Sequence, residues 1–129
     1  MRPYHVLIVL LYLGLNACAE RPVTPTGEVP SSAWIGHASM PTPRSEMPAV
    51  ELEGLIYAPG GFGGESQFEA YDPRQDAWQA LAQMPEPRQH LMAAAHSRRV
   101  YIFGGGKSVL NWAPSTQAWA YDPGLDRWV

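Results

Sequence analysis

Short apolar segments alternate with turns rich in glycine, proline and aspartate through most of the chain, after one long apolar run at its start. Residues 67–71 alternate, with Phe68 and Ala70 on one face, which predicts a strand. Residues 46–52, 55–61 and 77–81 predict three further short strands. No helical spacing of apolar residues occurs beyond the first fifteen positions. The pattern therefore predicts an all-β chain of four-stranded antiparallel sheets.

One series of residues occurs twice along the chain. It reads Met-Pro-x-Pro-Arg, an apolar segment ending in Gly-Gly, Tyr-Asp-Pro, and finally Asp-x-Trp, and its copies start at Met40 and Met84. The copies are offset by 44 residues up to the glycines and by 50 afterwards, so six extra residues lie between Gly105 and Tyr121. A fixed period with one variable loop is typical of a repeat architecture.

This repeated series resembles the kelch repeat, and the resemblance covers residues 34–129. The resemblance implies a β-propeller, in which four-stranded blades pack face to face around a channel. Residues 40–82 would be blade one and residues 84–129 blade two. Residues 32–38 would be an orphan outer strand, because Trp34 lies one 44-residue period before Trp78. Pro59 stands where the second copy has Phe103, so we expect the second strand of blade one to be irregular.

The number of blades sets an expectation about the whole protein, because propellers typically have about four to eight. We expect the sequence to be the N-terminal piece of a larger ring, with the orphan strand completing the last blade. A two-blade protein that closes its ring by oligomerisation is the alternative. Alone, two blades would leave large apolar faces uncovered and would be prone to aggregate.

The N-terminus predicts export from the cytoplasm. Arg2 precedes an apolar run of ten residues, positions 6–15, which as a helix would rise only about 15 Å and is typical of a signal peptide rather than a membrane anchor. Leu15-Asn16-Ala17-Cys18 resembles the lipobox of bacterial lipoproteins. The resemblance implies a lipid on Cys18 and, since Ala19 follows, sorting to the outer membrane. Cleavage at an ordinary signal peptidase site around Cys18 is the alternative, and it would give a secreted or periplasmic soluble protein.

Residues 1–18 are thus interpreted as a lipoprotein signal peptide, and residues 19–31, with three prolines and few apolar residues, as a tether. Scattered basic residues and a net charge of −3 argue against nucleic-acid binding. The single Cys excludes an internal disulfide or a Cys-based zinc site. His90 and His96 are six residues apart on one predicted strand, about 20 Å, and cannot share a metal. No cofactor or metal is expected.

The kelch resemblance also locates a candidate site. In these propellers the loops before the first strand and between the second and third strands surround one mouth of the channel. The residue two positions after Pro-Arg commonly points into that mouth. The ligand-binding candidates are therefore Glu46 and His90, the neighbouring Arg44 and Arg88, and Trp112 in the longer loop 106–115, which could stack on a sugar or a partner's side chain. For the two arginines a structural role in the turns is the alternative.

The strongly patterned residues all have structural explanations, which favours a binding or interaction scaffold of the cell envelope over an enzyme. Its partner would be an unknown protein or glycan at the mouth. The alternative is a sugar-active propeller resembling the kelch sialic-acid epimerases (mutarotases), with Glu46 and His90 as acid and base. A galactose-oxidase-like copper enzyme is less favoured, because that family needs a Cys crosslinked to Tyr and the one Cys here lies at the predicted cleavage site.

Overall fold

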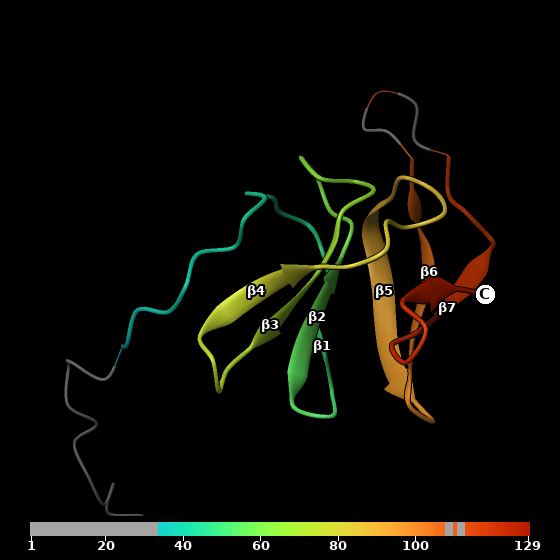
Figure 1. Cartoon of the computed structure of the whole chain (residues 1–129). Helices are drawn as coiled ribbons and strands as arrows, with labels where there is room; N and C mark the ends of the chain where they lie inside the picture. Colours follow the sequence, from blue (N-terminus) through green and yellow to red (C-terminus); the bar gives the residue numbers. More distant parts are fainter. Residues whose placement is uncertain (1–33, 108–109, 111–112) are drawn as a thin grey trace, which may run out of the picture. The chain divides into compact units, whose positions relative to one another are not determined.

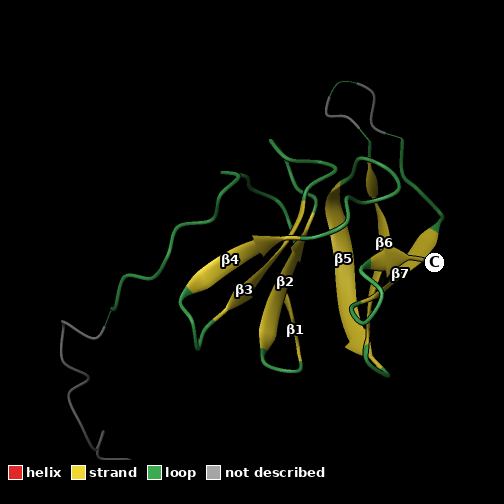
Figure 2. Cartoon of the chain, viewed as in Figure 1, coloured by secondary structure: helices red, strands yellow, loops and turns green. Residues whose placement is uncertain are grey.

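The computed structural model describes residues 34–107, 110 and 113–129, and every strand lies within the unit Ile35–Val129. The described residues form strands, turns and loops (Figure 2). No helix among them is long and apolar enough to cross a membrane. The strands make two four-stranded antiparallel sheets, which confirms the predicted all-β fold.

The first sheet is blade one, drawn green to yellow in Figure 1. Its strands lie side by side in chain order and are β1 (Val50–Leu52), β2 (Leu55–Pro59), β3 (Phe68–Asp72) and β4 (Ala77–Ala80). The turn between β1 and β2 is Glu53-Gly54, with φ of 54° and 87°. Two positive φ values in a two-residue connection match the right-handed twist of the strands it joins.

The second sheet is blade two, drawn orange to red. Its strands are again in chain order: β5 (Gln89–His96), β6 (Arg99–Gly106), β7 (Ala118–Asp122) and β8 (Arg127–Trp128). The first two strands of blade two are eight residues long, against three and five in blade one. Each copy of the repeat nevertheless forms one four-stranded antiparallel sheet.

Two strands of blade one are shorter than predicted by two residues or more, and the other two match their predicted ranges to within one residue. The first strand, expected over residues 46–52, starts only at Val50, after Pro48, which has no N–H to donate to the ladder. The second strand, expected over residues 55–61, ends at Pro59, whereas β6 continues to Gly106. Proline has no N–H to continue the ladder, so the strand stops at the residue that the sequence marked as irregular.

The two sheets pack face to face through an aromatic core. Phe68 of blade one lies against Tyr121 and Trp128 of blade two, with ring centroids 4.7 and 4.9 Å apart. Tyr57 stacks on Phe68, and Ile102 is buried in the same cluster. Edge-to-face and tilted aromatic pairs at these distances stabilise beyond the area they bury. The core fixes the angle between the blades and hence the arrangement of the loops at their ends.

A hydrogen-bonded clamp joins the end of blade one to blade two. Asp126 Oδ1 accepts hydrogen bonds from the Ala82 N–H at 2.8 Å and the Tyr121 hydroxyl at 2.7 Å. The indole N–H of Trp128 donates to the Ala82 carbonyl at 2.9 Å. The Ala82 N–H and the Tyr121 hydroxyl lower the pKa of Asp126, because they stabilise its carboxylate form.

Blade one carries the same clamp on its other face. Asp76 Oδ1 accepts from the Ala38 N–H at 2.8 Å and the Tyr71 hydroxyl at 2.6 Å, and Trp78 Nε1 donates to the Ala38 carbonyl at 2.9 Å. The hydrogen bond to Asp76 raises the pKa of Tyr71 to about 12. Residues 34–38 form no strand, since no described segment pairs with them. The orphan outer strand therefore stays a prediction. Ala38 nevertheless makes the same hydrogen bonds to an aspartate and a tryptophan as Ala82 does.

Candidate binding site at one end of the blades

The loops that precede β1 and β5 and those that follow β2 and β6 lie at the same end of the two sheets. In blade one, Ser45 and Phe62 exchange backbone hydrogen bonds at 3.1 and 2.7 Å. In blade two, the Ser115 N–H donates to the Gly105 carbonyl at 2.9 Å. The turns that join β1 to β2 and β5 to β6 lie at the opposite end (Figure 1). We call the loop end of the two blades the mouth.

Glu46 and His90 meet at the mouth, across the boundary between the blades. The His90 N–H donates to the Glu46 carbonyl at 2.9 Å, and His90 Nδ1 lies 3.3 Å from Glu46 Oε2. The two side chains are 42% (Glu46) and 48% (His90) exposed. The structure thus brings together two residues that are 44 positions apart in the sequence, and it leaves both open to solvent.

Both residues have a left-handed backbone, with φ of 57° for Glu46 and 54° for His90. The other non-glycine residues with positive φ lie in the tight turns between strands: Glu53, Asp76, Ser97, Arg98 and Asp126. A non-glycine residue in this region costs on the order of 1–2 kcal/mol. Strain of this kind concentrates at ligand clamps and active sites, so its occurrence at the same position of each repeat marks this pair.

The paired glycines of each repeat allow the loop before the first strand to approach. Gly61 has a φ of 101°, and a Cβ there would lie 2.6 Å from the Ser45 carbonyl oxygen. Gly105 is its repeat counterpart, with a φ of 76° and the Gln89 carbonyl oxygen 2.6 Å from a Cβ. Any side chain at these positions would therefore displace the backbone beside Glu46 or His90.

Arg44 lies beneath the mouth rather than in it. Its side chain is 0% exposed, and that of Glu69, to which it is bonded, is 4% exposed. Nη1 donates to Glu69 Oε2 and Nη2 to the Ala58 carbonyl, both at 2.7 Å. The Thr42 hydroxyl donates to the other oxygen of Glu69 at 2.9 Å. The guanidinium thus ties the loop before β1 to strands β2 and β3.

Arg88 has the same role in blade two with a carboxylate from a different position. Its side chain is 1% exposed, with Nη1 donating to the Gly104 carbonyl at 2.8 Å and Nη2 to Glu86 Oε2 at 2.9 Å. Glu86 occupies the repeat position of Thr42, and Trp119 occupies that of Glu69. The hydrogen bond from Arg88 lowers the pKa of Glu86, and Lys107, 3.4 Å away, lowers it further. Each arginine therefore has one carboxylate partner, although the repeat does not fix which residue supplies it.

These contacts bear on the predicted site residues. Enclosed guanidinium groups do not fit the ligand-binding role predicted for Arg44 and Arg88, and the geometry supports the structural alternative. Trp112 and Cys18 lie outside the described residues. Glu69 and Glu86, which neutralise the arginines, were not singled out from the sequence. The available signals were an acidic residue between Phe68 and Ala70 on the predicted strand and an acidic residue two positions before Arg88.

The site contains acid–base and hydrogen-bonding groups but no evident metal centre. In the part of the chain that the structure describes, no group of three His, Cys, Asp or Glu side chains is arranged to hold a metal ion. The carboxylate of Glu46 accepts hydrogen bonds, and an imidazole can donate or accept. This pair can therefore orient a polar ligand at the mouth.

Two four-stranded sheets packed face to face, with equivalent loops at one end, are blades of a β-propeller. Residues 43–85 match the sequence model of the Kelch motif. The chain belongs to the kelch-repeat family, as its repeated series predicted.

Relatives and a solved structure agree with this assignment. The chain is 33% identical over 101 residues to Kelch-like protein 35 of Mus musculus, and 29% identical over 108 residues to Alpha-scruin of Limulus polyphemus. The matches cover 75% and 79% of this chain but only 17% and 12% of those proteins. The solved structure of YjhT, 24% identical, superposes with a TM-score of 0.65 over 72% of this chain and 28% of its own. The likeness to YjhT concerns the fold.

Proposed function

We propose that this chain is part of a kelch interaction module that holds a polar ligand, a protein segment or a glycan, at the mouth around Glu46 and His90. The observation that carries the proposal is the contact between these two residues. Each is in a strained left-handed conformation, each is nearly half exposed, and both hold the same repeat position in adjacent blades. Membership of a family of interaction scaffolds supports the same function.

The surroundings of the pair support binding through hydrogen bonds rather than through a free cationic surface. Arg44 and Arg88 are enclosed and neutralised, and Lys107 lies beside Glu86. Phe62, a partly exposed aromatic side chain, follows the glycine pair of blade one at the same end. A ligand at the mouth would therefore contact a carboxylate, an imidazole and an aromatic face.

Site-specific crosslinking tests the proposal. A photoreactive phenylalanine analogue at position 62 should crosslink the partner at the mouth, and the same analogue at position 98, in the turn at the opposite end, serves as the control. We expect the crosslink from position 62 to be lost in the Glu46→Ala and His90→Ala variants. Crosslinks that form equally from position 98, or that survive both substitutions, would contradict a site at the mouth.

A sugar-active propeller is the second candidate. The specific observation in its favour is the carboxylate–imidazole contact of 3.3 Å between Glu46 and His90, because ring opening of a sugar needs a positioned acid and base. The test is the rate of anomer interconversion of sialic acid with the wild-type chain, Glu46→Gln and His90→Ala. Interconversion that is no faster with wild type than in buffer, or is unchanged in both variants, rules out catalysis by this pair.

We also propose that the module is anchored in the cell envelope by a lipid on Cys18, on the basis of the lipobox-like sequence. Two or more acyl chains would hold a soluble domain at a bilayer, at about 0.8 kcal/mol for each buried methylene. Cys18→Ser should abolish labelling by fatty acid and release the protein from membranes. A wild-type product that carries no fatty acid and begins after Cys18 would instead indicate an ordinary signal peptidase site.

A further inference from the structure

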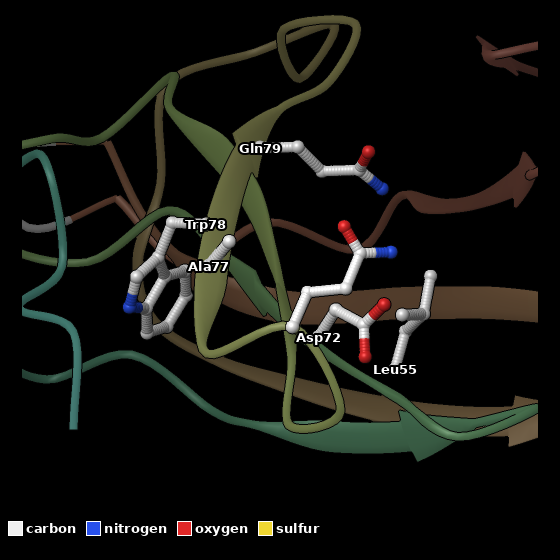
Figure 3. Close-up of a pocket in the computed structure, with 6 residues that line it drawn as sticks. Leu55, Asp72, Ala77, Trp78 and Gln79 are labelled. Carbon is white, nitrogen blue, oxygen red and sulfur yellow. The ribbon is translucent and has the colours of Figure 1, made fainter.

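A cavity lies on blade one, away from the mouth. It has a volume of about 330 Å³ and is lined by Leu55, Asp72, Gln75, Ala77, Trp78 and Gln79. Figure 3 shows Leu55, Asp72 and Gln79 extending to the same side of the sheet, while the indole of Trp78 points to the other side. The cavity is therefore bounded by one apolar side chain, one carboxylate and the amides of two glutamines.

Blade two shows what the same place holds in the other copy of the repeat. The paired register of β2 with β3 ends at Ile56 and Tyr71, next to Leu55 and Asp72, and that of β6 with β7 ends at Val100 and Tyr121, next to Arg99 and Asp122. In blade two, Arg99 Nη2 lies 3.6 Å from Asp122 Oδ2. Leu55 is the repeat counterpart of Arg99, so blade one keeps the aspartate and lacks its arginine.

The two aspartates are otherwise held alike. Asp72 Oδ1 accepts a hydrogen bond from the Arg74 N–H at 2.8 Å, and Asp122 Oδ1 accepts one from the Gly124 N–H at 3.0 Å. The second carboxylate oxygen of Asp122 faces Arg99. Among the described residues, no cationic side chain forms an ion pair with Asp72. Blade one thus presents a fixed carboxylate at the position where blade two binds a guanidinium.

The remaining lining residues of blade one complement a cation. Gln75 and Gln79 occupy the repeat positions of Leu125 and Val129, so amide groups replace apolar side chains beside the carboxylate. Amide oxygens accept hydrogen bonds, and a guanidinium has five N–H donors in one plane. Leu55 offers an apolar surface for the methylene stem of a long cationic side chain.

We propose that this cavity binds an arginine side chain of a partner protein, with Asp72 as its counter-ion and the Gln75 and Gln79 amides as further acceptors. The partner's guanidinium takes the place that Arg99 occupies in blade two. Arg74 is the arginine of this chain that could itself pair with Asp72. Its guanidinium instead lies against Gly54, with Nη2 3.4 Å from the position that a Cβ on that glycine would take.

The test is an NMR titration of the full isotope-labelled chain with N-acetyl-arginine methylamide. The citrulline analogue is the neutral control, because it has nearly the same shape without the charge. We expect saturable shifts of the Gln75 and Gln79 side-chain amides and the Leu55 methyls with the arginine probe. Binding should be about five- to tenfold weaker with citrulline or in Asp72→Asn, which keeps the turn because asparagine also accepts from the Arg74 N–H.

Two further variants sharpen the test. Leu55→Arg recreates the arrangement of blade two and should abolish binding without unfolding the chain, whereas Asp122→Asn, the matched change in blade two, should leave binding unchanged. The proposal is overturned if the wild-type chain shows no saturable shifts. It is also overturned if Asp72→Asn and Leu55→Arg bind the arginine probe as tightly as the wild-type chain does. Binding that appears only in Arg74→Ala also overturns it, because the cavity would then be filled by the chain's own arginine.

Discussion

At the residue scale, the glycine pair of each blade and the enclosed arginine next to it control the geometry of the mouth. Gly61 lies against the backbone of Ser45, and Arg44 is bonded to Glu69 beneath the same loop. One residue sets how closely the loop approaches, and the other ties it to the sheet. Each role can be tested with a substitution and a matched control, which is a glycine without the close contact in one case and an exposed arginine in the other.

The first prediction concerns the glycines. Gly61→Ala should destabilise the chain by more than the roughly 1–2 kcal/mol of a left-handed alanine, since its Cβ would also meet the Ser45 carbonyl oxygen at 2.6 Å. Gly104→Ala separates the two effects, because φ is 69° there but no atom lies within 4 Å of a Cβ. Urea unfolding should rank Gly61→Ala below Gly104→Ala in stability, with Gly36→Ala close to wild type. Equal stabilities for the first two would show that the close approach is absent.

The second prediction separates the buried arginine from an exposed one. Arg44→Met should lower the free energy of unfolding by about 3–5 kcal/mol, because it leaves the carboxylate of Glu69 buried without its cation. Arg98→Ala removes a pair with Glu53 at 3.0 Å whose side chains are 84% and 55% exposed, and it should cost at most about 1 kcal/mol. Chemical denaturation of both variants measures the difference. Similar small losses would mean that Arg44 is not enclosed and is open to a ligand-binding role.

At the element scale, the turn between β7 and β8 joins the two blades. Asp126 holds the backbone of Ala82 and the hydroxyl of Tyr121, while Trp128 covers Phe68. The Asp-x-Trp series recurs in each repeat, and in blade two it contacts the residue that follows blade one, Ala82. The contact between the sheets therefore combines the hydrogen bonds of this carboxylate with the aromatic core.

The third prediction is an acid dependence of this joint. The pKa of Asp126 lies below its ordinary value of 3.8 in the folded chain, so its contribution to stability is complete above that pH and is lost as the pH falls through the lowered pKa. Asp126→Asn should cost about 1 kcal/mol or more at pH 6 and much less at pH 3. Urea unfolding followed by Trp fluorescence at both pH values measures the difference. If wild type and variant lose the same free energy of unfolding between pH 6 and pH 3, the stabilising role of the Asp126 carboxylate is contradicted.

The same scale shows what could be predicted from sequence. The period of 44 residues and the Gly-Gly, Tyr-Asp-Pro and Asp-x-Trp positions predicted the sheets, because they specify the turns within each repeat. The start of β1 was predicted wrongly because the expected strand 46–52 included Pro48, which has no N–H for the ladder. The roles of Arg44 and Arg88 stayed open because their carboxylates come from non-equivalent positions, Glu69 and Glu86.

At the scale of the whole molecule, the outer face of blade two is the repeat counterpart of the face that blade one buries. Met92 and Phe103 pair across β5 and β6 on this face and are 62% and 37% exposed. In blade one the aromatic ring at the corresponding place comes from Phe68, opposite Pro59, whereas in blade two Phe103 lies opposite Ala118. The aromatic residue is on the third strand in blade one and on the second strand in blade two, so this face of blade two also has an aromatic surface suited to packing.

The fourth prediction is that this face causes self-association of the chain. Met92→Glu and Phe103→Glu should each reduce the apparent mass in light scattering at high protein concentration, because a charge there opposes apolar contact. Leu125→Glu, at an exposed apolar residue in the β7–β8 turn, is the control and should not change it. Wild-type chain that remains monomeric at all concentrations would contradict the prediction.

The central claim is that the mouth binds the ligand through Glu46 and His90 while the arginines serve the fold. The most direct test is the affinity of the partner captured from position 62, measured by calorimetry for wild type, Glu46→Ala, His90→Ala and Arg98→Ala. The account predicts a loss of about tenfold or more for the two variants at the mouth, about the value of a hydrogen bond to a charged group, and no change for Arg98→Ala. Equal affinity of all four proteins for the partner would contradict it.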